Sequence, residues 1–203
     1  MILLQSNYLP NLQYFSKLVA ADKVMIEQHE HYVKSSYRNR CYVCGPNREQ
    51  RLSVPLEKGK HQRKPMKDVR ISDDWNWQKI HWQTLCTFYR RSPYFEYYED
   101  DFAPFYEKKW EFLFQYNMEL LEMINGLLGL DKELVLTEKY ESTYDTLEDL
   151  RNVIHPKIDI AESGFTPPKY IQVFESKTQF FPNLSIVDLL FNEGPNAVNL
   201  LKA

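Results

Sequence analysis

The sequence contains only 6 glycines among 203 residues. Few glycines argue against the glycine-rich phosphate loops of Rossmann and P-loop proteins. No stretch approaches the roughly 20 mainly apolar residues that a membrane-spanning helix needs, so we expect no membrane span. The formal net charge is only −3, which gives no overall attraction to nucleic acid. We therefore predict no nucleic-acid partner.

Cysteine is also scarce, with three residues, an odd number that cannot pair fully within one chain. The opening MILLQSNYLP lacks the charged start and the long apolar run of an export signal. Free thiols in a reducing compartment explain both features most simply, so the sequence predicts a cytoplasmic protein.

The composition is that of a globular protein, with 43% hydrophobic and 26% charged residues. The length fits a single domain over 1–203, with a helical subdomain at 75–130 as a further expectation. Lys and Arg concentrate between residues 34 and 70, and acidic residues gather later in the chain. This distribution predicts a local basic face on a mildly acidic protein.

Two apolar runs with a helical pattern between them open the chain. MILLQS at 1–6 and KVMIEQ at 23–28 are typical of buried strands, and apolar residues fall at helical spacing within 10–21. A strand, a helix and a strand this close together form a βαβ unit with parallel strands. The predicted fold class is α/β with a mainly parallel sheet.

The rest of the chain adds a hairpin insertion and a helical addition to this opening. RCYVC and QRLSVPL flank the turn-forming GPNRE, which predicts a hairpin within 40–57. Pro104 is expected to break the aromatic and acidic segment at 94–108. The remaining expectations are a basic loop at 58–67, a strand at 69–72, helices at 75–91 and 109–130, a strand at 134–140, a short helix at 143–154, a strand at 169–174, and two helical segments within 183–203.

The stretch YVKSSYRNR at 32–40 gathers many polar groups. Arginine forks bind phosphate or carboxylate at two points, and lysine adds a point charge. Lys34, Arg38 and Arg40, with Asn39 beside them, therefore predict an anion-binding site where neighbouring tyrosines would stack on a base or a sugar. The alternative is a solvated basic edge strand whose charges prevent aggregation.

Gln5, Asn7 and Tyr8 follow directly on the first expected strand. Ligands of parallel α/β sheets bind beyond the carboxyl ends of strands, near the start of the next helix. We expect these residues to orient a substrate, with an ordinary strand-to-helix loop as the alternative. The layout resembles nucleotidyltransferase-like folds, but NLQY at 11–14 stands in the place of their HxGH motif, which argues against classical adenylyl transfer.

Three histidines are candidates for a general base, His29, His31 and His81, because the ordinary pKa of histidine lies near neutrality. His81 is surrounded by tryptophans in the sequence, so a half-buried structural histidine is the alternative. His29 and His31 could also join Cys41 and Cys44 around zinc. This spacing matches no common zinc module, and the cysteines can pack as small apolar groups, so we predict no metal site.

Two later stretches carry further expectations. Glu193 follows Asn192 near the end of an expected helix, where a negative charge opposes the helix dipole. A basic partner such as Arg38 or Arg40 would bring both residues into the anion site. The aromatic and acidic segment 92–110 is expected to pack internally, with a sugar platform or a homodimer contact as alternatives.

Several stretches together resemble the WbqC-like protein family. They are QSNYLPNLQYFSKLVAAD, YVKSSYRNR followed by LSVPL, HWQTLCTFYRRSPYFEYY, and FFPNLSIVDLLFNEGP. The resemblance covers nearly the whole chain. It implies a bacterial, cytoplasmic protein found among genes for O-antigen and other surface polysaccharides, and an aminoacyl (glycine) transferase role.

The residues and the resemblance together favour a transferase acting on a nucleotide-linked or otherwise anionic small molecule in surface-polysaccharide synthesis. Aminoacyl transfer to an activated sugar is the reaction that the resemblance implies. A non-catalytic nucleotide- or sugar-binding protein of the same pathway is one open alternative, and a diverged nucleotidyltransferase-like protein is another. None of these readings specifies a cofactor.

Overall fold

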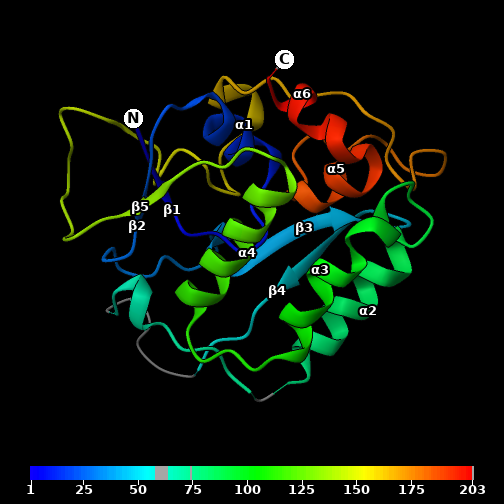
Figure 1. The fold of residues 1–203 in the computed structure, drawn as a ribbon, viewed down its shortest axis with the longest axis horizontal. Helices are drawn as coiled ribbons and strands as arrows, with labels where there is room; N and C mark the ends of the chain where they lie inside the picture. The colour runs from blue at the N-terminus through cyan, green and yellow to red at the C-terminus, as the bar shows by residue number, and fades with distance from the viewer. Residues whose placement is uncertain (58–63, 74, 203) are drawn as a thin grey trace.

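The main sheet consists of four short parallel strands in the order β5-β2-β1-β6 (Figure 1). The computed structural model describes residues 1–57, 64–73 and 75–202, so the first part of the expected basic loop, 58–63, lies outside the described residues. The strands are β1 (Ile2–Gln5), β2 (Val24–Glu27), β5 (Leu134–Leu136) and β6 (Glu148–Asp149). The predicted α/β class with a mainly parallel sheet is confirmed.

The βαβ opening forms as the sequence predicts. Helix α1 (Leu12–Ala20) connects β1 to β2, and its N-cap Asn11 accepts a hydrogen bond from the Tyr14 backbone N–H at 3.0 Å. Every residue of β1 is buried, as expected for a central parallel strand covered on both faces.

The hairpin insertion forms a separate two-stranded antiparallel sheet of β3 (Arg40–Cys44) and β4 (Glu49–Ser53). Strand β3 crosses the middle of the molecule in Figure 1, below helix α5 (Ile186–Glu193). The Ser185 backbone N–H donates to the Tyr42 carbonyl at 2.8 Å, which ties the start of α5 to the hairpin.

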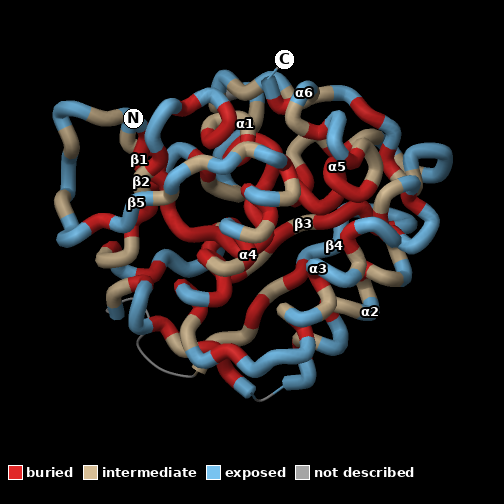
Figure 2. The backbone as a smooth tube through the Cα atoms, viewed as in Figure 1, coloured by how far each residue is buried: buried red, intermediate tan, exposed pale blue. Residues whose placement is uncertain are grey.

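The remaining helices complete one continuous core. Phe102, Leu120 and Phe191 belong to the same buried cluster as Leu4 of the sheet, and Figure 2 shows burial running through β1, β3, α4 and α5. The helices are α2 (Trp77–Tyr89), α3 (Phe95–Glu107), α4 (Leu113–Leu127) and α6 (Ala197–Lys202), with single 3-10 turns at Tyr37–Asn39, Met66–Asp68, Ile160–Ser163 and Gly194–Asn196.

The expected helix at 143–154 is wrong, because this segment supplies the edge strand β6 and then a turn. Its polar side chains bond to the backbone locally and to another side chain across the sheet. The Asp149 carboxylate accepts from the Arg151 backbone N–H at 3.0 Å, and the Arg151 guanidinium reaches Glu27 of β2 at 3.0 Å. These long-range contacts override the local helical pattern.

The expected strand at 169–174 is also absent: residues 169–172 are irregular, and a turn begins at Val173. The Gln172 amide side chain donates to the Phe181 carbonyl at 2.8 Å and accepts from the Phe181 N–H at 2.9 Å. A side chain thus makes the pair of bonds that a neighbouring strand would make. The expected strand at 69–72 contributes only isolated bridges at Arg70 and Ile71.

Residues 95–107 form helix α3, although Pro104 led us to expect a break. Phe95, Phe102 and Tyr106 are buried on one face of this helix. Their burial outweighs the one backbone hydrogen bond that proline removes. The expectation that this aromatic segment packs internally is confirmed.

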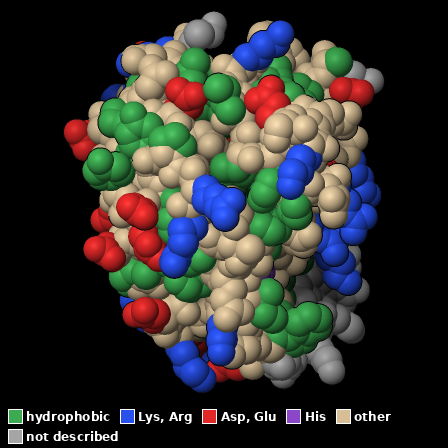
Figure 3. Space-filling model, turned by 90° about the vertical axis from the view of Figure 1, so that its right-hand side faces the viewer, with side chains coloured by type: hydrophobic (Ala, Val, Ile, Leu, Met, Phe, Trp, Pro, Cys, Tyr) green, Lys and Arg blue, Asp and Glu red, His purple; other side chains and the backbone are tan. Residues whose placement is uncertain are grey.

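Two surface properties complete the description. No helix within the described ranges has the length and apolar character needed to cross a membrane. On the face shown in Figure 3, Lys and Arg side chains lie among hydrophobic ones across the middle, while most acidic side chains lie toward the left edge and the top. Charge is therefore unevenly distributed over this face.

Candidate functional site

A groove of about 770 Å³ lies between the β3–β4 hairpin and the start of α2. We call it the hairpin groove. Its charged and polar lining includes Lys34, Asn39, Arg40, Arg51, Ser53 and Glu57. Its other lining includes Val54, Pro55, Trp75, Trp77, Ile80 and His81. Three of the four residues expected to bind an anion therefore meet in one groove, together with a candidate base.

Arg40 and Ser53 face each other across the hairpin as register partners. The Arg40 Nε and the Ser53 Oγ are buried, and neither has a hydrogen-bond partner among the residues that the structure describes. Buried polar atoms are normally paired with protein or water, so each of these two needs a partner that the protein itself does not supply. The exposed Lys34 and Arg51 add positive charge to the same lining.

Two tryptophans near the start of α2 form an aromatic wall of the groove. Trp77 is buried against the core, whereas Trp75 is 69% exposed. An exposed indole beside cations offers a flat apolar face for a ring, because aromatic groups stack in offset or edge-to-face geometry. The groove combines a place for a charged group with a place for a planar or apolar one.

His81 lies at the inner end of this wall. Its Nδ1 is 2.9 Å from the Tyr8 hydroxyl, which in turn is 3.1 Å from the Tyr106 hydroxyl. Burial lowers the pKa of His81 to about 4, and a hydrogen bond to the Ser53 backbone opposes this only in part. The imidazole is therefore neutral at pH 7 and is a weak base. Tyr8 reaches the groove only through His81.

Arg38 is placed differently from its neighbours in the sequence. It is 1% exposed, and its Nε and Nη2 donate to the two Glu30 oxygens at 2.8 and 2.6 Å. The lining of the groove does not include it. Burial raises the pKa of Glu30, although Arg38 opposes the shift. The Arg38 guanidinium, which the sequence predicts as a substrate ligand, is thus bonded to the internal Glu30 carboxylate.

Gln5 ends β1 and Asn7 follows it, and both are buried. The Gln5 amide donates to the Ile154 carbonyl at 3.0 Å. The Asn7 amide has no partner for either polar atom within the described chain. Neither residue lines the hairpin groove, so the strand end and the predicted anion site do not form one pocket.

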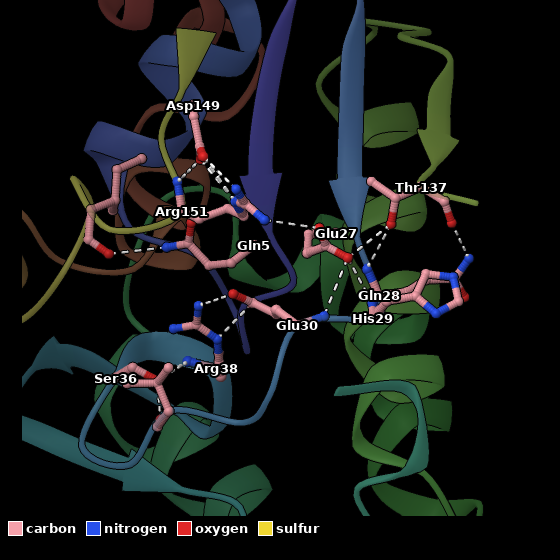
Figure 4. A network of polar contacts seen from close by, with 12 residues as sticks. Gln5, Glu27, Gln28, His29, Glu30, Ser36, Arg38, Thr137, Asp149 and Arg151 are labelled. Carbon is pink, nitrogen blue, oxygen red and sulfur yellow. Dashed lines mark hydrogen bonds and ion pairs between the residues drawn. The ribbon is translucent and has the colours of Figure 1, made fainter. Parts of the chain in front are cut away.

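A network of charges lies at the carboxyl ends of the strands, as Figure 4 shows. One Glu27 oxygen accepts from the Thr137 hydroxyl at 2.9 Å and from the His29 backbone N–H at 2.7 Å. The other oxygen accepts from Arg151, which also bonds to Asp149. Because its members bond to one another, the network holds the ends of β2 and β6 together. Because the sequence predicted a helix at 143–154, it gave no indication that Arg151 takes part in this network.

The remaining predicted residues lie outside the groove. His31 is exposed and forms a bridge with Pro65, and His29 is half-buried. Cys41 and Cys44 are buried, and burial raises the pKa of Cys44 to about 12, so both pack as neutral thiols. Within the described ranges, no three His, Cys, Asp or Glu side chains lie close enough together to hold a metal ion.

Glu193 does not complete the anion site. Its carboxylate accepts from the Asn196 side chain at 3.0 Å, and no ion pair between described residues joins it to Arg38 or Arg40. Asn192 donates to the Asp188 carbonyl at 2.7 Å and lines a separate pocket beside Phe174. The expected link between the closing motif and the arginines is wrong, because Arg38 already has Glu30 as its partner.

The groove residues that the prediction missed include Arg51, Ser53, Glu57 and Trp75. The signal for the first two was the antiparallel register, which sets Ser53 opposite Arg40 and Arg51 opposite Tyr42. Directly opposite residues of an antiparallel pair have adjacent side chains. Once the hairpin is predicted, the residues opposite a charged stretch are therefore candidates for the same binding site. Trp75 precedes α2, and only the folded packing of this helix against the hairpin brings it to the groove.

Comparison with known protein families identifies the family to which this chain belongs. The family model described as "WbqC-like protein family" matches residues 5–160 and 155–200. The chain belongs to the WbqC-like protein family. The curated "Uncharacterized protein Rv1507c" of Mycobacterium tuberculosis (strain ATCC 25618 / H37Rv) is 28% identical over 224 residues, covering 98% of this chain and 96% of the relative. No solved structure matches this WbqC-like chain.

Proposed function

We propose that the hairpin groove binds a nucleotide-linked anionic substrate, and that this protein is a cytoplasmic transferase of bacterial surface-polysaccharide synthesis. The observation that carries the proposal is the pair of buried, unpartnered polar atoms at Arg40 and Ser53, beside an open cavity. The pathway and the aminoacyl (glycine) transfer come from the family resemblance, and the geometry supports the anionic character of the substrate.

The two walls of the groove bind different parts of the substrate. Arg40, Lys34 and Arg51 hold phosphate or carboxylate oxygens, because guanidinium groups bind such oxygens in paired hydrogen bonds. Trp75 covers the flat face of a base or sugar. Asn39 supports the site indirectly, since its amide donates to the Val54 carbonyl at 2.9 Å and accepts from the Tyr32 hydroxyl at 2.9 Å.

Proton transfer in this groove falls to a residue other than His29 or His31, which do not line it. Glu57 is a half-exposed lining carboxylate that pairs with Arg70 at 3.1 Å. We assign it the role of general base, because Glu57 places a carboxylate in the groove lining and carboxylates act as proton acceptors in general acid–base catalysis. His81 acts as a neutral hydrogen-bonding group that fixes the inner wall.

A non-catalytic ligand-binding protein of the same pathway is the second candidate. The low pKa of His81 and its bonded nitrogen favour this reading, because they leave Glu57 as the principal proton acceptor of the groove. The two candidates share the same ligand and differ only in turnover.

Thermal unfolding in the presence of nucleotides and nucleotide sugars tests ligand binding first. A ligand at about 100 times its Kd stabilises a protein by about 2.7 kcal/mol. We expect stabilisation by a nucleotide-linked compound that is lost in Arg40→Ala and kept in Arg48→Ala, an exposed arginine of the hairpin turn outside the groove. Stabilisation that survives Arg40→Ala would contradict the assigned site.

Turnover separates the two candidates. With the stabilising nucleotide sugar and a panel of activated amino acids, the transferase reading predicts a product whose formation falls at least about 100-fold in Glu57→Gln, since general bases contribute about 10²–10⁴. Binding that is normal in Glu57→Gln, with no turnover by either protein, would establish the binding-protein reading.

A further inference from the structure

A second pocket, of about 290 Å³, lies where the order of the parallel strands reverses. Strand β1 has β2 on one side and β6 on the other. The pocket is lined by Gln13, in the first turn after β1, and by His155 and Asp159, which follow β6. Open α/β sheets bind ligands beyond the carboxyl ends of strands at such reversal points. We call this cavity the switch pocket.

An unpartnered donor lies in the wall of the switch pocket. Gln13 is 4% exposed, and Asn183 fixes its position by accepting from the Gln13 backbone N–H at 3.0 Å. The Asn183 amide also donates to the Gln13 side-chain oxygen at 3.4 Å. The Gln13 Nε2 remains buried and without a partner in the described chain, so a donor is held ready for an acceptor in the pocket.

Two tyrosines supply the aromatic part of this lining. The rings of Tyr37 and Tyr42 are half-buried, with centroids 6.2 Å apart and planes at 86°. Edge-to-face packing fixes the orientation of each ring. The pocket therefore has rigid apolar surface next to the amide pair.

Charge distinguishes the switch pocket from the hairpin groove. No Lys or Arg is among its described lining residues, whereas Glu49 and Asp159 contribute exposed carboxylates. Carboxylates accept hydrogen bonds from hydroxyl donors. Amide, carboxylate and tyrosine groups together suit a ring with apolar C–H faces and several hydroxyls.

We infer that the switch pocket binds an uncharged sugar ring, with Gln13 and Glu49 bonding its hydroxyls and Tyr42 covering one face. Tyr42 follows Arg40 by two positions on β3, so the two sites lie roughly 7 Å apart along the strand. A role as the acceptor site of a transferase rests on the proposed function. Sugar binding itself does not.

Saturation-transfer NMR of the full chain with millimolar glucose, galactose and N-acetylglucosamine tests this inference. We expect transfer to at least one sugar, with affinity about fivefold weaker in Glu49→Ala, which loses one hydrogen bond, and about tenfold weaker or more in Tyr42→Ala. Glu49 is exposed, so this variant keeps the test valid if Tyr42→Ala does not fold.

Arg40→Ala is the matched control, because Arg40 lines the groove and not the switch pocket. The inference predicts unchanged sugar binding in Arg40→Ala, whatever happens to nucleotide binding. Sugar binding that Arg40→Ala abolishes and Glu49→Ala leaves intact would overturn it, as would the absence of transfer to every sugar. Loss of nucleotide binding alone would count against the proposed function only.

Discussion

Asp188 shows how one residue can couple stability to pH. It is fully buried, and it accepts from the Tyr89 and Tyr170 hydroxyls, each at 2.6 Å. No described Lys or Arg forms an ion pair with it. Burial raises its pKa from 3.8 to about 6, since the two hydroxyls offset the lost hydration only in part.

The folded state therefore holds this proton more tightly than the unfolded state. The resulting stability is fully present below about pH 4 and is lost as the pH rises through about 6. Between these limits, we expect wild-type unfolding free energy to fall relative to Asp188→Asn by about 2–3 kcal/mol. Urea unfolding at several pH values measures this difference, and parallel pH profiles for the two proteins would contradict it.

The buried ion pair between Arg38 and Glu30 predicts a different mutational pattern. Removing one partner of a buried pair leaves an uncompensated charge and costs about 3–5 kcal/mol. We expect this cost in Arg38→Met, and a recovery of most of it in the double variant with Glu30→Met. Arg90→Ala is the control, because its pair with Glu99 is exposed and should cost less than about 1 kcal/mol.

Chemical denaturation of the four proteins measures these costs. If Arg38→Met were as stable as the wild type but failed to bind the nucleotide ligand, Arg38 would be a substrate residue, as the sequence alone indicated. The burial of its guanidinium and its two bonds to Glu30 argue for the structural outcome.

Between elements, the junction of α5 and the following 3-10 turn depends on Gly194. Its φ is +53°, and a Cβ there would lie 2.5 Å from the Tyr94 ring. Gly194→Ala should cost more than about 2 kcal/mol, because strain and overlap both oppose it. Gly126 in α4 has nothing within 4 Å of such a Cβ, so Gly126→Ala should stabilise by about 0.5 kcal/mol. Thermal unfolding compares the two, and equal effects would contradict the argument.

Local patterns predicted those elements whose stability is largely local. The βαβ opening and the hairpin followed from apolar runs and turn residues, and both formed near the predicted positions. Strand β6 and the irregular segment that begins at residue 169 could not be predicted in this way. Their positions depend on side-chain hydrogen bonds from Arg151 to Glu27 and from Gln172 to the Phe181 carbonyl, and no local pattern reveals these bonds.

The candidate site was predictable only in part for the same reason. Residue types marked Lys34, Asn39 and Arg40, which the fold gathers in one groove. The same types also marked Arg38, whose guanidinium turns inward to Glu30. Neighbours in a 3-10 turn and strand point in different directions, so chemistry alone cannot separate them.

Across the whole molecule, net charge and local charge act in opposite directions on an anionic ligand. The chain carries −3 overall, whereas Lys34, Arg40 and Arg51 line the groove. Raising ionic strength from about 0.05 to 0.5 M shortens the screening length to a few ångströms. We expect nucleotide binding to weaken several-fold over this range and sugar binding to stay constant. Calorimetric titrations at several salt concentrations test this, and equal sensitivity of both ligands would contradict it.

The bond between Glu27 and Arg151 has a consequence for folding during synthesis of the protein. The two residues are 124 positions apart. At roughly 5–20 residues per second, Arg151 is synthesised about 6–25 s after Glu27. Until then the Glu27 carboxylate lacks this guanidinium partner. The contact between the end of β2 and the segment after β6 can therefore form only late in synthesis, when the last strand of the sheet has been made.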